Sequence, residues 1–138
     1  LEDDDLFGNI TNLKSRNKQV ERSILNSKYL NDIYLYALHV IKGRWPEAEE
    51  FIKKDPGWAY FYAKDVIYGR WPEAEEFIKE SPCYAFYYAF YILGGRWPEA
   101  EEVISKDPEW AHRYTRDVVK GRWLEGEEAH LRFLDDSI

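Results

Sequence analysis

The feature that most constrains this chain is an internal repeat with a period of 26 residues. The segment GRWPEAEEFIKKDPGWAYFYAKDVIY spans residues 43–68, and closely similar segments follow at residues 69–94 and 95–120. A partial copy, GRWLEGEEAH, begins at Gly121. A unit of this length is one supersecondary element that buries its apolar face only by stacking on its neighbours. The repeat therefore predicts a stacked array.

Prolines divide each repeat into two helices. In the first repeat they stand at Pro46 and Pro56, and proline suits the first position of a helix because its missing N–H has no partner there. Asp55 precedes the second proline and supplies the side-chain oxygen of an N-cap. We predict helices over residues 46–54 and 56–68. The repeat glycines are expected just past the second helices, in the left-handed conformation that ends a helix; they are Gly43, Gly69, Gly95 and Gly121.

The second helices repeat apolar residues at helical spacing, as in Ala59, Tyr62, Ala63, Val66 and Ile67. The same spacing occurs in residues 28–42, which lack the GRWPEAE motif, and residues 19–26 are a suitable partner helix. The chain is thus predicted to be all-α, with short helix-turn-helix repeats stacked as a small α-solenoid and capping helices at both ends.

Sequence changes at the two ends indicate where the array stops. Residues 2–5 are all acidic, and in the last copy Leu124 replaces the proline and Gly126 replaces the alanine. Terminal repeats of a stack are atypical because they shield its end faces. The predicted organisation is an acidic flexible tail over residues 1–13, N-terminal helices with a degenerate repeat over 14–42, repeats over 43–68, 69–94 and 95–120, and a partial repeat with a C-terminal cap over 121–138.

Composition narrows the classes of partner. The 138 residues include 19 Lys and Arg against 26 Asp and Glu, a net charge of -7, so binding to nucleic acid is not expected. No apolar stretch is long enough to cross a bilayer, and no secretion signal opens the chain. The single cysteine cannot form an internal disulfide, which suits a reducing compartment. We expect a soluble, cytoplasmic protein without membrane contact.

The inventory of reactive residues predicts no enzyme. The three histidines, His39, His112 and His130, are not paired at a metal-binding spacing, and no phosphate-binding loop or nucleophile motif occurs. The Glu-x-Glu-Glu of each first helix is interpreted as solvated carboxylates that the helix dipole favours. Cys83 stands where the other repeats have Gly and Glu, and it is interpreted as a tolerated variant. We expect no catalytic residue, no cofactor and no metal site.

An arginine precedes the tryptophan of every copy. If these arginines have a binding function, their guanidinium groups could bind phosphates or an acidic partner. As scaffold, each arginine could tie its unit to acids or helix carbonyls of the neighbouring unit, while the tryptophan fills the gap between units. Recurrence in every unit favours the scaffold role. This arginine row consists of Arg44, Arg70, Arg96 and Arg122.

Function in a repeat protein is expected where the units differ on their surface. The middle repeat is aromatic at second-helix positions that are charged in its neighbours. Its Phe86, Tyr87, Phe90 and Tyr91 would bring about 600–1,000 Å² to a surface, and one side of a standard interface is about 800 Å². The alternative is that flanking helices or the N-terminal arm cover them. The predicted partner-binding residues are Tyr60, Phe61, Lys64, Phe86, Tyr87, Phe90, Tyr91, Arg113 and Arg116.

The pattern GRWPEAE, followed by DP, WA, YA and DVI at fixed offsets, resembles a family of short tandem helical repeats in uncharacterised proteins of tailed bacteriophages. The resemblance covers residues 28–130 and implies an α-helical repeat fold and a viral source. A viral source in turn implies the cytoplasm of the host cell. The family brings no catalytic residues that could be transferred to this chain.

These observations lead to a leading hypothesis and three alternatives. The leading one is a non-enzymatic α-solenoid that binds a protein through its aromatic second-helix face; a phage-encoded chain would inhibit a host or defence protein. The first alternative is capture of a nucleotide or short single strand, with bases stacked on tyrosines and phosphates held by the arginine row. The aromatic face could also form a homodimer. Imitation of DNA by the glutamates ranks last, because the arginines offset their charge.

Overall fold

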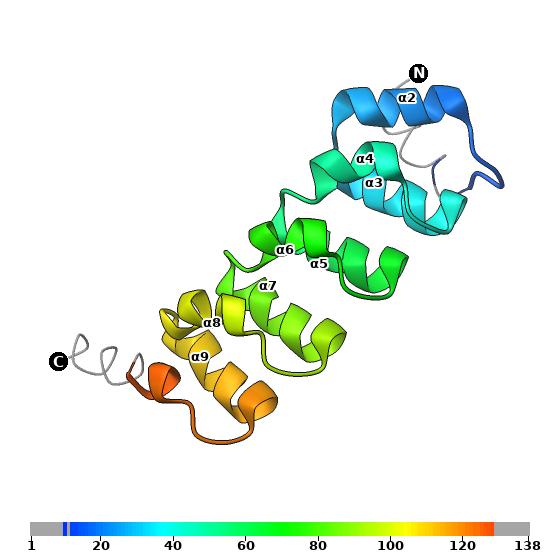
Figure 1. The fold of residues 1–138 in the computed structure, drawn as a ribbon. Coiled ribbons are helices and arrows are strands. Elements are labelled where there is room, and N and C mark those ends of the chain that lie inside the picture. The colour runs from blue at the N-terminus through cyan, green and yellow to red at the C-terminus, as the bar shows by residue number, and fades with distance from the viewer. Residues whose placement is uncertain (1–9, 11, 129–138) are drawn as a thin grey trace.

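The computed structural model describes residues 10 and 12–128, and in this part of the chain pairs of short helices stack side by side along one axis (Figure 1). The predicted all-α stack of helical repeats is confirmed. The first helices of the units are α2 (Lys18–Ser27), α4 (Pro46–Ile52), α6 (Pro72–Ile78) and α8 (Pro98–Ser105). Each second helix is an α-helix continued by a π-helical turn: α3 (Leu30–Tyr36) with η1 (Ala37–Ile41), α5 (Pro56–Tyr62) with η2 (Ala63–Ile67), α7 (Pro82–Tyr87) with η3 (Tyr88–Leu93), and α9 (Pro108–Tyr114) with η4 (Thr115–Val119).

The helices of the repeats begin at the predicted prolines and caps. Asp55 accepts a hydrogen bond from the Trp58 N–H at 3.0 Å, and Ser81 accepts one from the Tyr84 N–H at 3.3 Å. These contacts satisfy N–H groups that have no partner inside the helix. The first helices are shorter than predicted, since α4 ends at Ile52 rather than at residue 54.

Every second helix ends in a π-helical turn, in which hydrogen bonds span five residues instead of four. The Lys42 N–H donates to the Ala37 carbonyl, and the Gly43 N–H reaches the same oxygen at 3.2 Å. Because two successive N–H groups converge on one carbonyl, the chain reverses at the first of them. The prediction of a left-handed repeat glycine is therefore wrong by one position. The left-handed residues are Lys42, Tyr68, Gly94 and Lys120, with φ of 58°, 64°, 71° and 57°.

Small and large side chains alternate in the core. Ala59 and Ala63 are fully buried in the second helix, and they let the helices approach closely. The ring of the buried Tyr62 lies 4.9 Å, centroid to centroid, from Trp71 of the next unit. Trp71 is 1% exposed. The prediction that the tryptophan fills the space between units is confirmed.

Apolar residues of the predicted N-terminal tail belong to the core. Ile10 is fully buried, and Leu13 packs against the core while half-buried. The prediction of a flexible tail over residues 1–13 is therefore wrong at these two positions, because burial removes the apolar surface of both side chains from water. Residues 1–9 of that tail lie outside the described residues.

In the last copy the tryptophan lies too close to the backbone at residue 126 for a side chain there. A Cβ added at Gly126 would lie 2.4 Å from Cε3 of Trp123. Alanine, which the other repeats have at this position, does not fit here. Residues 129–138 of the predicted C-terminal cap lie outside the described residues.

Alanine substitutions at two adjacent glycines test which of them needs the left-handed conformation. Gly94→Ala is expected to lower the free energy of unfolding by about 1 kcal/mol, because a Cβ is strained at positive φ. Gly95→Ala is the matched control: nothing lies within 4 Å of its added Cβ, so the change stays within about 0.5 kcal/mol. Urea denaturation followed by circular dichroism measures both. A larger loss for Gly95→Ala would contradict the assignment.

Candidate functional site

One polar arrangement joins the two helices of the middle unit. The Tyr88 hydroxyl accepts a hydrogen bond from the Trp71 backbone N–H at 2.8 Å and donates to Glu75 Oε2 at 2.6 Å. Arg70 donates two hydrogen bonds to the same carboxylate, at 3.0 and 2.9 Å. The Tyr88 ring packs on Trp97 of the next unit with centroids 4.8 Å apart. We call this set of tyrosine, glutamate, arginine and the backbone N–H of the residue after the arginine the clamp.

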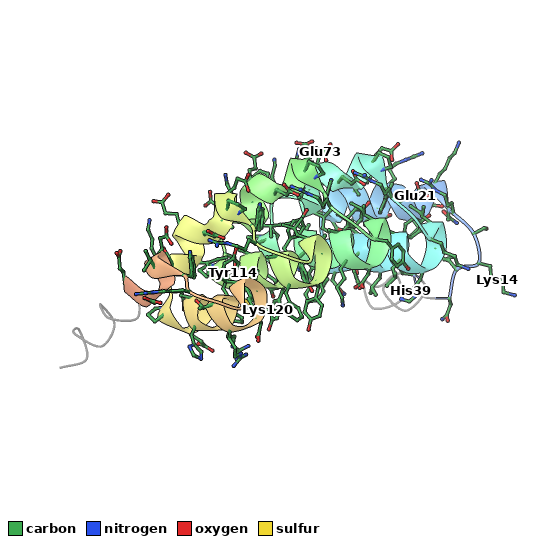
Figure 2. All side chains as sticks on the ribbon, turned by 60° about the horizontal axis from the view of Figure 1, so that its bottom comes forward. Lys14, Glu21, His39, Glu73, Tyr114 and Lys120 are labelled. Carbon is green, nitrogen blue, oxygen red and sulfur yellow. The ribbon has the colours of Figure 1, made fainter. Side chains whose placement is uncertain are left out.

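The clamp recurs along the stack. Tyr62 and Tyr114 make the same two hydrogen bonds in the units on either side, with the carboxylates of Glu49 and Glu101. Figure 2 shows Tyr114 between the two layers of helices rather than at an outer edge. Because every complete repeat has the clamp, it holds the stack together and does not distinguish one unit from another.

A fourth clamp, which sequence analysis missed, closes the N-terminal unit. Tyr36 donates to Glu21 at 2.5 Å, Arg16 donates two hydrogen bonds to Glu21 at 2.9 Å, and the Asn17 N–H donates to Tyr36. Here the tyrosine follows the glutamate by 15 residues, whereas the spacing is 13 in the repeats. The two extra residues hide the clamp of this unit, though not its helices, from a search at fixed period. The spacing of five residues from arginine to glutamate is the signal that could have found it.

The arginine row is a row of ion pairs inside the units. Arg44 donates two hydrogen bonds to Glu49 at 2.8 Å, and Arg122 lies 3.3 Å from Glu127. The expected tie to acids or carbonyls of the neighbouring unit is wrong, because the first helix of the same unit places a glutamate within reach. The Arg44 guanidinium does lie 6.0 Å from the ring of Trp71 in the next unit. The carboxylates neutralise the row, so the phosphate-binding alternative loses its free cations.

The clamp shifts the titration of its members in opposite directions. Burial alone would raise the pKa of Glu75, but hydrogen bonds from Arg70 and Tyr88 outweigh it and hold the pKa below the ordinary value of 4.5. Burial raises the pKa of Tyr88 above its ordinary 10.0, and the hydrogen bond to the Glu75 carboxylate adds to the effect. Both groups therefore keep their hydrogen-bonded forms over a wide range of pH.

Aromatic rings cover the second helices of the central repeats, but two predicted binding residues lie beneath the others. Phe86 is 5% exposed, with Trp110 of the next unit 5.6 Å away. Tyr60 is 4% exposed, with the rings of Tyr84 and Tyr87 each 5.9 Å away. The expectation that Phe86 and Tyr60 are exposed anchors is wrong, because each is covered by aromatic residues of the following unit.

The exposed part of the aromatic surface is smaller than predicted. Phe61, Phe90, Tyr91 and Tyr68 are 37%, 41%, 60% and 82% exposed, and Tyr87 is half-buried. At about 200 Å² for a whole side chain, these fractions amount to roughly 400 Å². That is about half of one side of a standard interface. The charged residues around the rings would have to supply the other half.

Charged side chains flank the exposed rings in the neighbouring units. Lys64 lies 3.8 Å from Asp65, and Arg116 makes two hydrogen bonds to Asp117, at 2.9 and 2.8 Å. The Arg113 guanidinium lies 4.8 Å over the Trp110 ring. We call the outward positions of the three central second helices the second-helix face: Phe61, Lys64, Asp65, Tyr68, Tyr87, Phe90, Tyr91, Gly94, Arg113, Arg116, Asp117 and Lys120.

The first helices present a different surface. Their outward positions are acidic in all three repeats, and Figure 2 places Glu73 at one edge of the stack with His39 and Lys120 toward the other. This first-helix face comprises the exposed Glu47, Glu50, Glu73, Glu76, Glu99 and Glu102. The two faces therefore differ in charge and in aromatic content.

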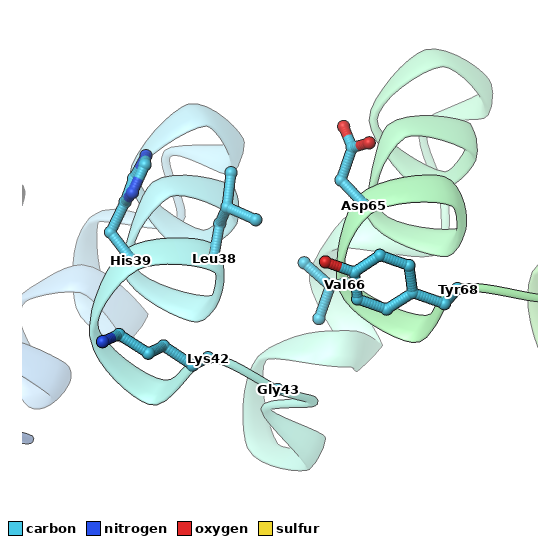
Figure 3. Close-up of a pocket in the computed structure, with 7 residues that line it drawn as sticks. All are labelled: Leu38, His39, Lys42, Gly43, Asp65, Val66 and Tyr68. Atoms are coloured by element: carbon cyan, nitrogen blue, oxygen red, sulfur yellow. The ribbon is translucent and has the colours of Figure 1, made fainter.

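A cleft of about 300 Å³ lies between η1 and η2. Leu38 and Val66 point toward each other across it, whereas His39 points away (Figure 3). Asp65 already accepts a hydrogen bond from the Tyr34 hydroxyl at 2.5 Å. The reactive groups at this cleft do not converge on a common point. Its lining consists of Leu38, His39, Lys42, Gly43, Asp65, Val66 and Tyr68.

Other classes of site find little support in residues 10 and 12–128. Within these residues no three His, Cys, Asp or Glu side chains are placed to hold a metal ion. Burial raises the pKa of the Cys83 thiol, whereas reactive cysteines have a lowered pKa. The helices of the same part of the chain are too short or too polar to span a membrane.

Comparison with known proteins gave no match: no family model, no curated protein and no solved structure is significantly similar to the chain. The function is therefore argued from the chemistry of the two faces.

Removal of one clamp hydroxyl tests its contribution to stability. Tyr88→Phe leaves the Trp71 N–H and the Glu75 carboxylate each short of a hydrogen bond, so it is expected to lower the free energy of unfolding by about 1–3 kcal/mol. Tyr91→Phe is the matched control, since that side chain is 60% exposed. Urea denaturation measures both variants. Equal losses in the two would contradict the role of the clamp.

The clamp also predicts how stability depends on pH. Carboxylates with a lowered pKa stabilise the fold above their ordinary value of 4.5, and this contribution is lost as the pH falls below it. Tyrosines with a raised pKa stabilise it below their ordinary 10.0, and this contribution is lost as the pH rises above it. Urea denaturation across the pH range should show both declines. Tyr88→Phe should weaken the alkaline decline, and an unchanged decline would refute this assignment.

Proposed function

We propose that this chain is a non-enzymatic helical-repeat protein that binds another protein through its second-helix face. One observation carries the proposal: of the five exposed aromatic side chains in residues 10 and 12–128, four lie on this face and the fifth is Tyr29. The exposed four are Phe61, Tyr68, Phe90 and Tyr91.

The size and composition of the face support protein binding. Its roughly 400 Å² of aromatic surface is within the range of about 300–600 Å² for the largest apolar patch of a typical monomer, and such patches are often functional. Tyrosine and arginine are the residues that most often dominate binding energy at interfaces. The Arg113 guanidinium extends the aromatic surface, since it lies 4.8 Å over the Trp110 ring and 3.7 Å from Glu109 Oε1.

The distribution of variation supports the same face. The clamp residues recur in each complete repeat, whereas the middle unit has Phe90 and Tyr91 where its neighbours have a cation followed by an acid. In a stack of repeats, shared residues maintain the array and unlike surface residues give it specificity. Binding is proposed in place of catalysis because the reactive side chains that do converge are those of the clamp.

The nature of the partner is a further step in the proposal. This step rests on the resemblance of the GRWPEAE repeats to proteins of tailed bacteriophages. The resemblance suggests a host or defence protein as the target and the host cytoplasm as the location. The fold alone carries no such information.

A double substitution tests the proposed face. A photo-reactive residue replacing Phe61 is expected to cross-link a protein in an extract of the source cells. Phe90→Ser with Tyr91→Ser should reduce the adduct at least about tenfold, because loss of central aromatic anchors is costly. Glu73→Ser with Glu76→Ser, on the first-helix face, is the matched control and should leave the yield unchanged.

Circular dichroism of both double variants checks that helix content is retained. Equal adduct yield in the two double variants, or no protein adduct at any concentration, would contradict the proposed function. An adduct between two copies of the chain counts as a protein adduct in this experiment.

A further inference from the structure

The middle unit of the second-helix face departs from the charge pattern that its two neighbours share. Equivalent positions lie 26 residues apart, so each row across the face takes one residue from each of the three repeats. In every row the middle residue is uncharged, and the outer residues are charged or aromatic. The rows are Phe61, Tyr87 and Arg113; Lys64, Phe90 and Arg116; Asp65, Tyr91 and Asp117; and Tyr68, Gly94 and Lys120.

We infer that this face is the interface of a symmetric homodimer, with a two-fold axis that runs in the interface along α7 and η3. The inference rests on the proposed function and narrows it, since the protein partner becomes a second copy of this chain. In a two-fold interface, residue i of one copy contacts residue j of the other, and j contacts i. Residues on the axis contact the same residues of the second copy. The unit at residues 43–68 faces the unit at residues 95–120 of the second copy.

The residues on the axis are suited to self-contact. A charged residue there would meet its own charge, and the middle unit has none on this face. Phe90 and Tyr91, the exposed rings of the middle unit, would pack against the same rings of the second copy. Aromatic pairs of this kind are favourable beyond the area that they bury. The uncharged residues of the middle unit can therefore pack against the same residues of a second copy on the two-fold axis.

Two rows place an aromatic ring opposite a cation. Phe61 faces Arg113 of the second copy, and Tyr68 faces Lys120 of the second copy. A cation over an aromatic face is attracted to it. Arg113 is already held over Trp110, and Tyr68, at 82% exposed, is the most exposed aromatic side chain in the described part of the chain. These contacts give a partner to rings that are otherwise left in water.

The other two rows form ion pairs across the axis. Lys64 and Asp65 are consecutive residues of η2 on the two sides of its crest, and in the dimer they exchange their ion pair within one copy, at 3.8 Å, for ion pairs with the second copy. Arg116 and Asp117 do the same, with the cation again first. A two-fold rotation exchanges the two sides. Lys64 therefore faces Asp117 of the second copy, and Asp65 faces Arg116 of the second copy.

The order of cation and acid recurs with the repeat, and it meets a condition that a second copy imposes and a foreign partner does not. A foreign protein can match any order of charges, so it does not require the two flanking units to agree. A second copy requires this agreement, because reversing the order in one unit would set cation against cation and acid against acid. The acidic first-helix faces are less suited to contact between copies, because like charges repel.

Charge reversal tests this arrangement. Lys64→Glu places an acid opposite Asp117 of the second copy, and Asp117→Lys places a cation opposite Lys64. Within one copy the two positions are separated by two helix spacings, about 20 Å, which exceeds the screening length of about 10 Å at moderate salt. Any coupling between them therefore arises across two copies.

The measurement is mass by light scattering at low and high concentration, with circular dichroism to confirm folding. The unmodified chain is expected to be a dimer at high concentration, and each single variant should dimerise at least about tenfold more weakly. The double variant Lys64→Glu with Asp117→Lys should recover the dimer. An equimolar mixture of the two single variants should also recover it, because both ion pairs of the mixed dimer then join opposite charges.

Each other outcome overturns the inference. A monomer at every concentration, with cross-linking to a foreign protein still lost in the Phe90→Ser and Tyr91→Ser double variant, would refute the homodimer and leave the proposed function standing. A dimer that the single variants do not weaken uses another surface. Single variants that weaken the dimer, with no rescue by the double variant or the mixture, would refute the pairing of Lys64 with Asp117.

Discussion

The structure depends on one hydrogen-bonded tyrosine in each unit. Its hydroxyl accepts from the backbone N–H at the start of the first helix and donates to a carboxylate one turn later, as Tyr88 does with Trp71 and Glu75. Its ring at the same time packs on the tryptophan of the following unit. One side chain therefore makes both the hydrogen bonds that join the two helices of a unit and the apolar contact between units. This explains how such short helices form an ordered stack.

This arrangement leaves the two outer faces free to differ. The arginines, which could have been a ligand-binding row, are neutralised by the glutamates of the clamp. The first-helix face is uniformly acidic, and the second-helix face holds the exposed rings with cations on both sides of them. An uncharged middle unit between two units with the same order of cation and acid has the symmetry that contact between two copies requires.

The stack could be predicted from the sequence because a strict period and paired prolines determine a helical repeat almost alone. Local hydrogen bonding could not be predicted in the same way. The left-handed residue is Tyr68 rather than Gly69, because the π-helical turn depends on backbone contacts that side-chain spacing does not report. The exposed rings Phe90 and Tyr91 were predicted, but Phe86 is buried. Its burial depends on Trp110 of the next unit, and therefore on the rotation of one helix against another.

Hydroxyl-radical footprinting of the unmodified chain, at increasing protein concentration, tests the central claim that the second-helix face is the interface between two copies of the chain. Reactivity is read separately for each exposed aromatic side chain. The account predicts that Tyr91, Phe90 and Tyr68 lose reactivity together as the concentration rises, while Tyr29, which is 61% exposed outside this face, keeps its reactivity. Unchanged reactivity at all four side chains, or protection that begins at Tyr29, would contradict it.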